Sequence, residues 1–158
     1  LESKEVNSRY VNIKIIDNNQ FIFFTNYHSP KALEFNTHEQ IAAKFFWPST
    51  NTQIRMKAII TKCSTEYNSE YFSQRSVDKN ALAISSNQSQ QIDSYEEIVS
   101  KYQETKKNKD LSICPDYWGG FAFSPYYFEF WKGHASRLNK RECYAEIKGV
   151  WDKYLLQP

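Results

Sequence analysis

The residues best suited to chemistry in this sequence are single arginines and lysines that stand near aromatic side chains. Six of them are well separated along the chain: Arg9, Lys14, Lys31, Arg75, Arg137 and Arg141. Guanidinium groups bind phosphate through two hydrogen bonds and stack on flat rings. Lys31 also falls in the first turn of a helix expected to begin at Ser29-Pro30, where the helix dipole favours an anion. The set could serve a flat, phosphorylated ligand, although scattered basic residues are usually solvated.

Other kinds of reactive site receive little support from the sequence. The three histidines and three cysteines lie far apart, without the spacing of a zinc site or of a disulfide framework. No Ser/His/Asp or Cys/His arrangement stands out, and Glu96-Glu97 is expected to be part of a helix face. All four glycines lie in the last quarter of the chain, so a glycine-rich phosphate loop is absent. Any phosphate must therefore be bound by side chains.

Length and composition limit the remaining possibilities. The 158 residues are expected to form one domain, and 16% aromatic residues are enough to fill its core. A net charge of +2 gives no argument for nucleic-acid or membrane binding. No apolar stretch is long enough to span a bilayer, and the polar opening at Leu1-Glu2 does not look like a secretion signal. Three separate cysteines favour a reducing, cytoplasmic compartment.

The elements that must position these side chains are expected to be mainly short, aromatic-rich strands. The predicted strands cover 10–16, 21–25, 41–47, 53–63, 121–123, 127–132, 143–147 and 151–156. Helices are predicted over 29–35, 64–74 and 94–106, and an irregular polar segment over 75–91. No alternation of strands and helices indicates a parallel sheet, so an antiparallel barrel with a few covering helices fits best.

Several stretches then resemble the motifs of one family. They are Thr25-Asn26-x-x-Ser29-x-Lys31-Ala32, Phe46-Trp47-Pro48 before Gln53-Ile54-Arg55, Tyr71-Phe72-Ser73-Gln74-Arg75, Pro115-x-x-Trp118-Gly119-Gly120, and Glu129-Phe130-Trp131-Lys132-Gly133 followed by Arg137-Leu138 and Arg141. Together they resemble the pyridoxine/pyridoxamine 5'-phosphate oxidases, which are FMN enzymes with an antiparallel split β-barrel fold. The resemblance runs from about Arg9 to Pro158 and implies one FMN-binding domain over 1–158, without the N-terminal segment that the family places over its substrate.

The resemblance also implies roles for individual residues. The positions that match cofactor contacts are Arg9, Lys14, Phe24, Thr25, Lys31, Gln53, Gln88, Ser89, Trp131 and Arg141. The positions that match substrate contacts are Lys14, Tyr71, Arg75, Lys79, Arg137 and Asn139. Among these, Arg137 matches the catalytic residue that covers the pyridine ring opposite the flavin. The family is a homodimer with FMN at the interface, and it oxidises pyridoxamine or pyridoxine 5'-phosphate to pyridoxal 5'-phosphate while O2 becomes H2O2.

Three positions depart from the pattern that the resemblance implies. Pro30 replaces an arginine that contacts the FMN phosphate, Lys79 replaces a serine of the substrate-phosphate site, and Asn139 replaces a histidine that contacts substrate. The cofactor set is therefore better kept than the substrate set. Two alternatives stay open beside the vitamin B6 oxidase: a related split-barrel FMN oxidase for another planar substrate, of the phenazine-pathway type, and a non-catalytic paralogue that binds flavin or pyridoxal phosphate.

Overall fold

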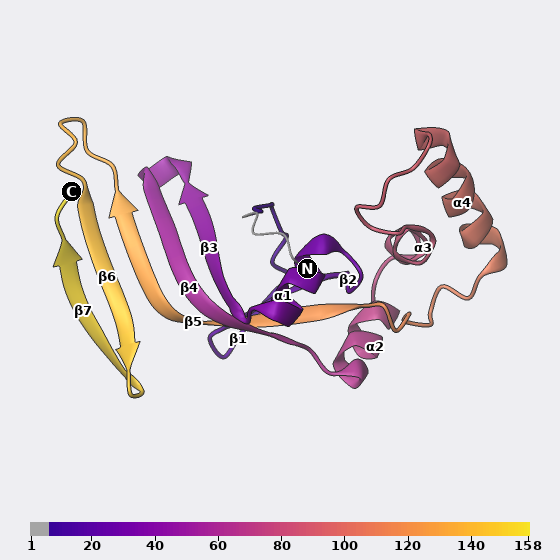
Figure 1. Cartoon of the computed structure of the whole chain (residues 1–158), viewed down its shortest axis with the longest axis horizontal. Coiled ribbons are helices and arrows are strands. Elements are labelled where there is room, and N and C mark those ends of the chain that lie inside the picture. Colours follow the sequence, from indigo (N-terminus) through magenta and orange to yellow (C-terminus); the bar gives the residue numbers. More distant parts are fainter. Residues whose placement is uncertain (1–6) are drawn as a thin grey trace.

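The computed structural model describes residues 7–158 (Figure 1). Its strands are β1 (Ile15–Asp17), β2 (Gln20–Asn26), β3 (Gln40–Trp47), β4 (Thr52–Lys62), β5 (Trp118–Lys132), β6 (Lys140–Ile147) and β7 (Val150–Leu156). Its α-helices are α1 (Pro30–Thr37), α2 (Thr65–Ser73), α3 (Val77–Ser85) and α4 (Tyr95–Asn108), with one 3₁₀ turn, Pro48–Thr50. Within the described part of the chain the strands form one antiparallel sheet, as the sequence predicts.

The 15-residue strand β5 holds the sheet together. Its first half pairs with β2, its second half pairs with β6, and β4 runs along its other edge. The pairing with β4 shifts between Lys57 and Ala58, opposite Tyr127 and Pro125, and such a bulge bends a strand. Figure 1 shows the result: β5 crosses the molecule from the helices α2 to α4 at one end to the β6–β7 hairpin at the other.

The core lies on the inner face of β4 and β5. Ile54, Met56, Ala58 and Ile60 alternate along β4 with exposed residues, most of them polar or charged, as the period of two in the sequence predicts. They pack with phenylalanines of β2 and β5: Phe23, Phe121 and Phe123. Full burial of each large apolar side chain contributes roughly 1.5–3 kcal/mol.

Gly119 and Gly120 let β5 pass directly against α2. Asn68 of α2 accepts a hydrogen bond from the Gly120 N–H at 2.8 Å and donates one to the Tyr27 hydroxyl at 2.9 Å. A Cβ atom on Gly119 would lie 2.1 Å from the Tyr27 hydroxyl oxygen and 2.3 Å from the Asn68 amide nitrogen, so a side chain there would push α2 away. This close approach places the end of α2, with Arg75 just beyond it, over the start of β5.

Three predicted elements are wrong in extent. The segment 75–91 is not irregular throughout, because α3 occupies Val77–Ser85. Strand pairing in 10–16 begins only at Ile15. The separate strands predicted over 121–123 and 127–132 are one strand, because Pro125 sits at the bulge, where a missing N–H is tolerated.

Candidate functional site

One group of predicted site residues gathers where β2 ends and α1 begins. The side-chain oxygen of Gln88 accepts three hydrogen bonds there: from the Thr25 hydroxyl at 2.7 Å, the Asn26 main-chain N–H at 3.1 Å and the Lys31 amine at 3.3 Å. We call these four residues the Gln88 cluster. A hydroxyl, an N–H and an ammonium group that converge on one oxygen form the donor set that binds a phosphate oxygen.

Local sequence explains why Lys31 lies in this cluster. Pro30 begins α1 as predicted, so Lys31 falls in its first turn, and it is only 7% exposed. Ser29 stands at the N-cap position, but its hydroxyl accepts from the Lys31 amine at 3.3 Å and caps no helix N–H. Burial lowers the pKa of Lys31, and the nearby Arg9 lowers it further. Arg9 itself pairs with Glu34 at 3.0 Å on the side of α1.

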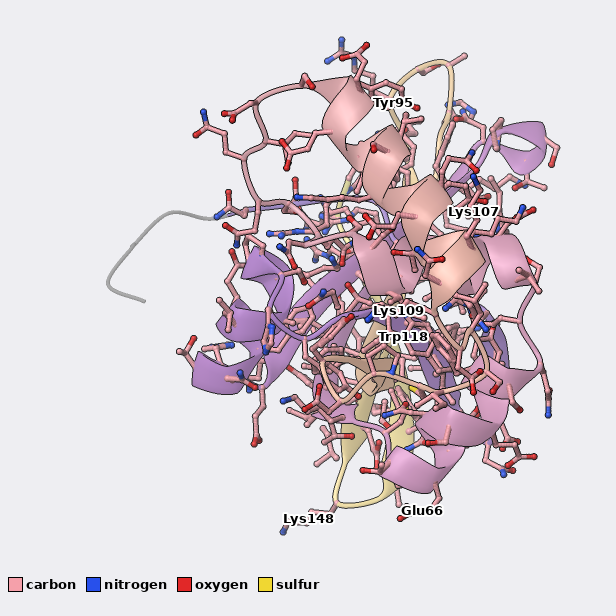
Figure 2. The ribbon with its side chains drawn as sticks, turned by 90° about the vertical axis from the view of Figure 1, so that its right-hand side faces the viewer. Glu66, Tyr95, Lys107, Lys109, Trp118 and Lys148 are labelled. Carbon is pink, nitrogen blue, oxygen red and sulfur yellow. The ribbon has the colours of Figure 1, made fainter. Side chains whose placement is uncertain are left out.

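A cavity of about 260 Å³ adjoins the Gln88 cluster. Its walls come from β2, the end of α2, α3, the loop after α3 and the start of β5, and consist of Phe24, Thr25, Asn26, Arg75, Lys79, Leu82, Ala83, Ser86, Gln88 and Trp118. Five of these ten were predicted as site residues from positions far apart in the sequence. Figure 2 views this helical end of the molecule, with Trp118 below the Tyr95–Lys107 run of α4.

Arg75 and Trp118 define one wall of the cavity. The Arg75 guanidinium lies 4.4 Å from the centroid of the Trp118 ring, within the range of a cation–π contact. Its Nη2 donates to the Lys79 carbonyl at 3.3 Å, while its Nη1 is buried and has no hydrogen-bond partner in residues 7–158. Burial lowers the pKa of Arg75. Because Arg75 lines the cavity, its guanidinium can contact an anion there.

The other residues predicted near this cavity lie around it. Tyr71 stacks on Phe24 with ring centroids 3.8 Å apart, so it backs the cavity wall without lining it. Lys14 is exposed just before β1 and does not line the cavity. Ser89 follows Gln88 on an exposed turn and adopts a left-handed backbone with φ of 67°.

A second group of predicted residues lies at the other end of the sheet. Gln53 on β4, Trp131 on β5 and Arg141 on β6 are direct cross-strand neighbours, and cross-strand neighbours point to the same face. We call them the Trp131 row. The Arg141 Nε donates to the carboxylate of the buried Glu129 at 2.8 Å. An amide, an indole and a guanidinium in one row can contact a flat, polar ring system.

The loop between β5 and β6 carries Arg137 beside this row. Arg137 has a left-handed backbone with φ of 60°, and its N–H donates to the His134 carbonyl at 2.9 Å. The Asn139 side-chain oxygen accepts from the His134 N–H at 3.0 Å. Asn139, predicted as a substrate contact, therefore holds the loop that presents Arg137.

The Gln88 cluster and the Trp131 row do not meet within one chain. Trp131 follows Trp118 by thirteen positions on β5, which is about 40 Å along a strand. Figure 1 shows the two regions at opposite ends of the molecule, one by α3 and the other by β6 and β7. The fold thus divides the predicted site residues into two distant half-sites.

Sequence reasoning missed several residues that the structure brings into these half-sites, among them three that contact a predicted site residue. They are Asn26, whose main-chain N–H binds Gln88 although only side chains were expected to bind a phosphate, Trp118, which contacts Arg75, and Glu129, which binds Arg141. Each lies inside a motif that had been recognised, so the signal was present. Their roles depend on partners far away in the sequence.

Residues 7–158 contain no group of three or more histidine, cysteine or acidic side chains that could hold a metal ion. None of the helices in this range combines the length and hydropathy needed to cross a bilayer.

Comparison with known proteins gives concordant matches. Residues 118–158 match the family model of the pyridoxine 5'-phosphate oxidase C-terminal dimerisation region. The pyridoxine/pyridoxamine 5'-phosphate oxidase of Actinobacillus pleuropneumoniae serotype 5b (strain L20) is 37% identical over 152 residues, covering 96% of this chain and 73% of the relative. The enzyme of the same name from Coxiella burnetii is also 37% identical, with 96% and 78% covered.

Two solved structures share the architecture. PhzG from Burkholderia lata 383, in complex with tetrahydrophenazine-1-carboxylic acid, superposes with a TM-score of 0.89 at 25% identity, covering 98% of this chain and 76% of that one. A pyridoxamine 5'-phosphate oxidase-related, FMN binding protein from Nostoc punctiforme PCC 73102 gives a TM-score of 0.76 at 15% identity, with 95% and 79% covered. At that identity the second match speaks for the fold alone.

Proposed function

The chain belongs to the pyridoxine/pyridoxamine 5'-phosphate oxidase family of FMN-dependent oxidoreductases, and we propose from this premise that it oxidises pyridoxamine or pyridoxine 5'-phosphate to pyridoxal 5'-phosphate, with O2 reduced to H2O2. The observation that carries the proposal is the joining of the Gln88 cluster to a cavity lined by Arg75, Lys79 and Trp118. A phosphate donor set beside a cationic, aromatic cavity suits a phosphorylated planar ligand.

The residues present fit FMN. Thr25, the Asn26 N–H and Lys31 now share the Gln88 oxygen, and the same donors would hold an oxygen of the FMN phosphate. Gln53, Trp131 and Arg141 would contact the flavin ring system. FMN supplies the two-electron oxidation when it is bound, and the protein supplies binding and orientation.

Substrate recognition falls to the cationic side of the cavity. Arg75 lines the cavity and would bind the substrate phosphate, with Lys79 adding a second charge. Arg137 would cover the substrate ring, held in place by the loop that Asn139 closes. Fixing the substrate between two surfaces gives proximity, and the site then needs no strong general base.

The separation of the two half-sites supports a homodimer in which each complete site is formed by residues of both copies. A second copy would bring its Trp131 row and its Arg137 loop to the Gln88 cluster of the first. The surface at that end is suited to association, because Phe46, Leu138, Trp151 and Leu155 are large apolar residues exposed by 43% or more. The match to a family dimerisation region over 118–158 agrees with this arrangement. The cytoplasmic compartment stays a prediction.

A phenazine-type oxidase is the second candidate. It is favoured by the 0.89 TM-score to PhzG bound to tetrahydrophenazine-1-carboxylic acid, and by Asn139, which is turned to its own loop where the B6 enzymes use a histidine. Such a substrate has a carboxylate in place of a phosphate, which Arg75 could also bind.

A spectroscopic titration tests the proposal. The purified chain is expected to show the visible absorption of a bound flavin after incubation with FMN. Anaerobic addition of pyridoxamine 5'-phosphate should bleach the absorption, and air should restore it with release of peroxide. Bleaching by tetrahydrophenazine-1-carboxylic acid alone would favour the second candidate. If the protein takes up FMN but neither compound bleaches it, the remaining hypothesis is a non-catalytic paralogue that binds flavin.

A further inference from the structure

Glu129 is a buried carboxylate on the face of the sheet that carries the Trp131 row. Its side chain is 6% exposed. One carboxylate oxygen accepts from Arg141 Nε at 2.8 Å, and the other accepts from Arg55 Nη2 at 2.5 Å and from the Tyr127 hydroxyl at 3.2 Å. A buried carboxylate needs such partners, because an unpaired buried charge is strongly destabilising.

Strand register places Glu129 where it can reach Arg141. In the strand register, Glu129 lies opposite Arg55 on β4 and opposite Cys143 on β6. This row is two residues along the strands from the Trp131 row, so both rows face the same side of the sheet. Cys143 is small and fully buried, so the Arg141 side chain can extend past it to the carboxylate. Burial alone would raise the pKa of Glu129, but the hydrogen bond from Arg141 and the charge of Arg55 outweigh it and leave the pKa below its usual value. The carboxylate is therefore charged at neutral pH.

The Arg141 guanidinium is held at two points. Nε is held by Glu129, and Nη1 donates to the Gln157 carbonyl at 3.0 Å. Nη2 donates to no atom of residues 7–158. A planar guanidinium fixed through two of its nitrogens has a fixed orientation, so its third nitrogen points in a defined direction.

We propose that Glu129 is the positioning residue of the flavin half-site: it fixes Arg141 so that one free guanidinium nitrogen stands beside Trp131 and Gln53 before FMN arrives. This role rests on the proposed function, because it assigns Arg141 to the cofactor. Arg55 pairs with the other carboxylate oxygen and so stabilises the buried charge of Glu129. The Arg141 side chain is then already fixed in the folded protein, so FMN binding does not have to meet the entropy cost of ordering it.

A double-mutant cycle on FMN binding tests this role. The dissociation constant is measured by quenching of FMN fluorescence, without substrate, for wild type, Glu129→Gln, Arg141→Ala and the double variant. Glu129→Gln is expected to weaken FMN binding about tenfold. The double variant is expected to bind no more weakly than Arg141→Ala alone, because Glu129 acts only through Arg141.

Two control variants separate positioning from general loss of structure. Glu142→Gln makes the same change one residue from Arg141 on the opposite face, where Glu142 pairs with Lys140 and Lys153, and FMN affinity should stay within twofold. Arg55→Ala removes the other arm of Glu129; it should lower the thermal midpoint as much as Glu129→Gln does, with less than threefold change in FMN affinity. Equal loss of affinity in Arg55→Ala would show a structural effect and overturn the proposal.

A variant that keeps Glu129 in place covers the case in which Glu129→Gln does not fold. Arg141→Lys retains the charge but cannot keep two fixed contacts and a free donor, so it should bind FMN about as weakly as Arg141→Ala. Wild-type affinity in Arg141→Lys, or in a folded Glu129→Gln, would overturn the positioning role alone. A wild-type chain that takes up no FMN would overturn the proposed function as well.

Discussion

The guanidinium carbon of Arg75 lies 4.4 Å from the centroid of the Trp118 ring, at the wall of the cavity. The pair joins the end of α2 to the first residue of β5. It holds a half-buried cation that has no ion-pair partner in residues 7–158, and a ring face stabilises a partly desolvated guanidinium. The Arg75–Trp118 pair is therefore suited to bind an anion in the cavity.

Replacing Arg75 should therefore affect substrate more than cofactor. Arg75→Lys keeps the charge but loses the planar contact with Trp118, and the KM for pyridoxamine 5'-phosphate should rise roughly 5- to 150-fold, the equivalent of ~1–3 kcal/mol for a charged hydrogen bond. The FMN dissociation constant should be nearly unchanged. Steady-state kinetics with FMN titration check both. A variant with wild-type KM would mean that the substrate anion binds elsewhere.

Lys31 should matter for cofactor binding. Lys31→Ala removes the ammonium group from the Gln88 cluster and is expected to weaken FMN binding by ~1–3 kcal/mol. Fluorescence titration with FMN measures the change. Lys107→Ala, an exposed lysine in the last turn of α4, is the matched control and should bind FMN as wild type does. An unchanged dissociation constant in Lys31→Ala would remove Lys31 from the cofactor site.

Asn139 should act on turnover through Arg137. Asn139→Ala removes the acceptor for the His134 N–H. The left-handed backbone at Arg137 is unfavourable by about 1 kcal/mol, so without this hydrogen bond the loop should leave that conformation and Arg137 should lose its position. We expect a roughly tenfold lower kcat with FMN still bound, and a smaller loss in Asn139→Asp, which keeps an acceptor oxygen. Arg137→Ala should show the same kcat loss. Equal kcat in Asn139→Ala and wild type would show that the loop does not position Arg137.

Alkaline pH should weaken the Glu129 network through Tyr127. Burial, with the hydrogen bond to Cys143, raises the pKa of Tyr127 to about 12. A tyrosine in the unfolded chain ionises near pH 10, so from there to about pH 12 the folded chain holds a proton that the unfolded chain has lost. Stability from this group is complete below pH 10 and falls as the pH rises through the folded pKa.

Comparison with Tyr127→Phe isolates this effect. The advantage of wild type over the variant in the free energy of unfolding should shrink by on the order of 2 kcal/mol between pH 9 and pH 12. Lysines titrate alike in both proteins and cancel in the difference. Urea denaturation at several pH values gives the numbers, and a pH-independent difference would contradict the assignment.

The sequence predicts elements well where the signal is local. The alternation of Ile54, Met56 and Ala58 with polar neighbours predicts β4, and Ser29-Pro30 predicts the start of α1. Helix α3 was not predicted, because the segment around it is polar and shows no clear helical period; the contacts of Asn80 help to explain why it forms. In the structure the Asn80 amide is buried and donates to the Phe72 and Leu111 carbonyls, which are 8 and 31 residues away.

For the candidate site too, the sequence predicts what depends on local motifs and not what depends on distant contacts. The motifs identify Gln53, Trp131 and Arg141 as contacts of one cofactor, but their row depends on strand register, and the bulge opposite Lys57 and Ala58 sets that register. Glu129 could not be assigned for the same reason. Nor could the sequence show that Asn139 turns its side chain to His134, because that depends on the course of the loop.

The length of β5 has a genetic consequence. If each site joins the Gln88 cluster of one copy to the Trp131 row of the other, Lys31→Ala and Arg141→Ala damage different halves of it. In a mixed dimer of the two variants, one site carries both defects and the other carries none. Random mixing of equal amounts should leave about a quarter of all sites intact, so two alleles that each weaken FMN binding would complement each other when expressed together.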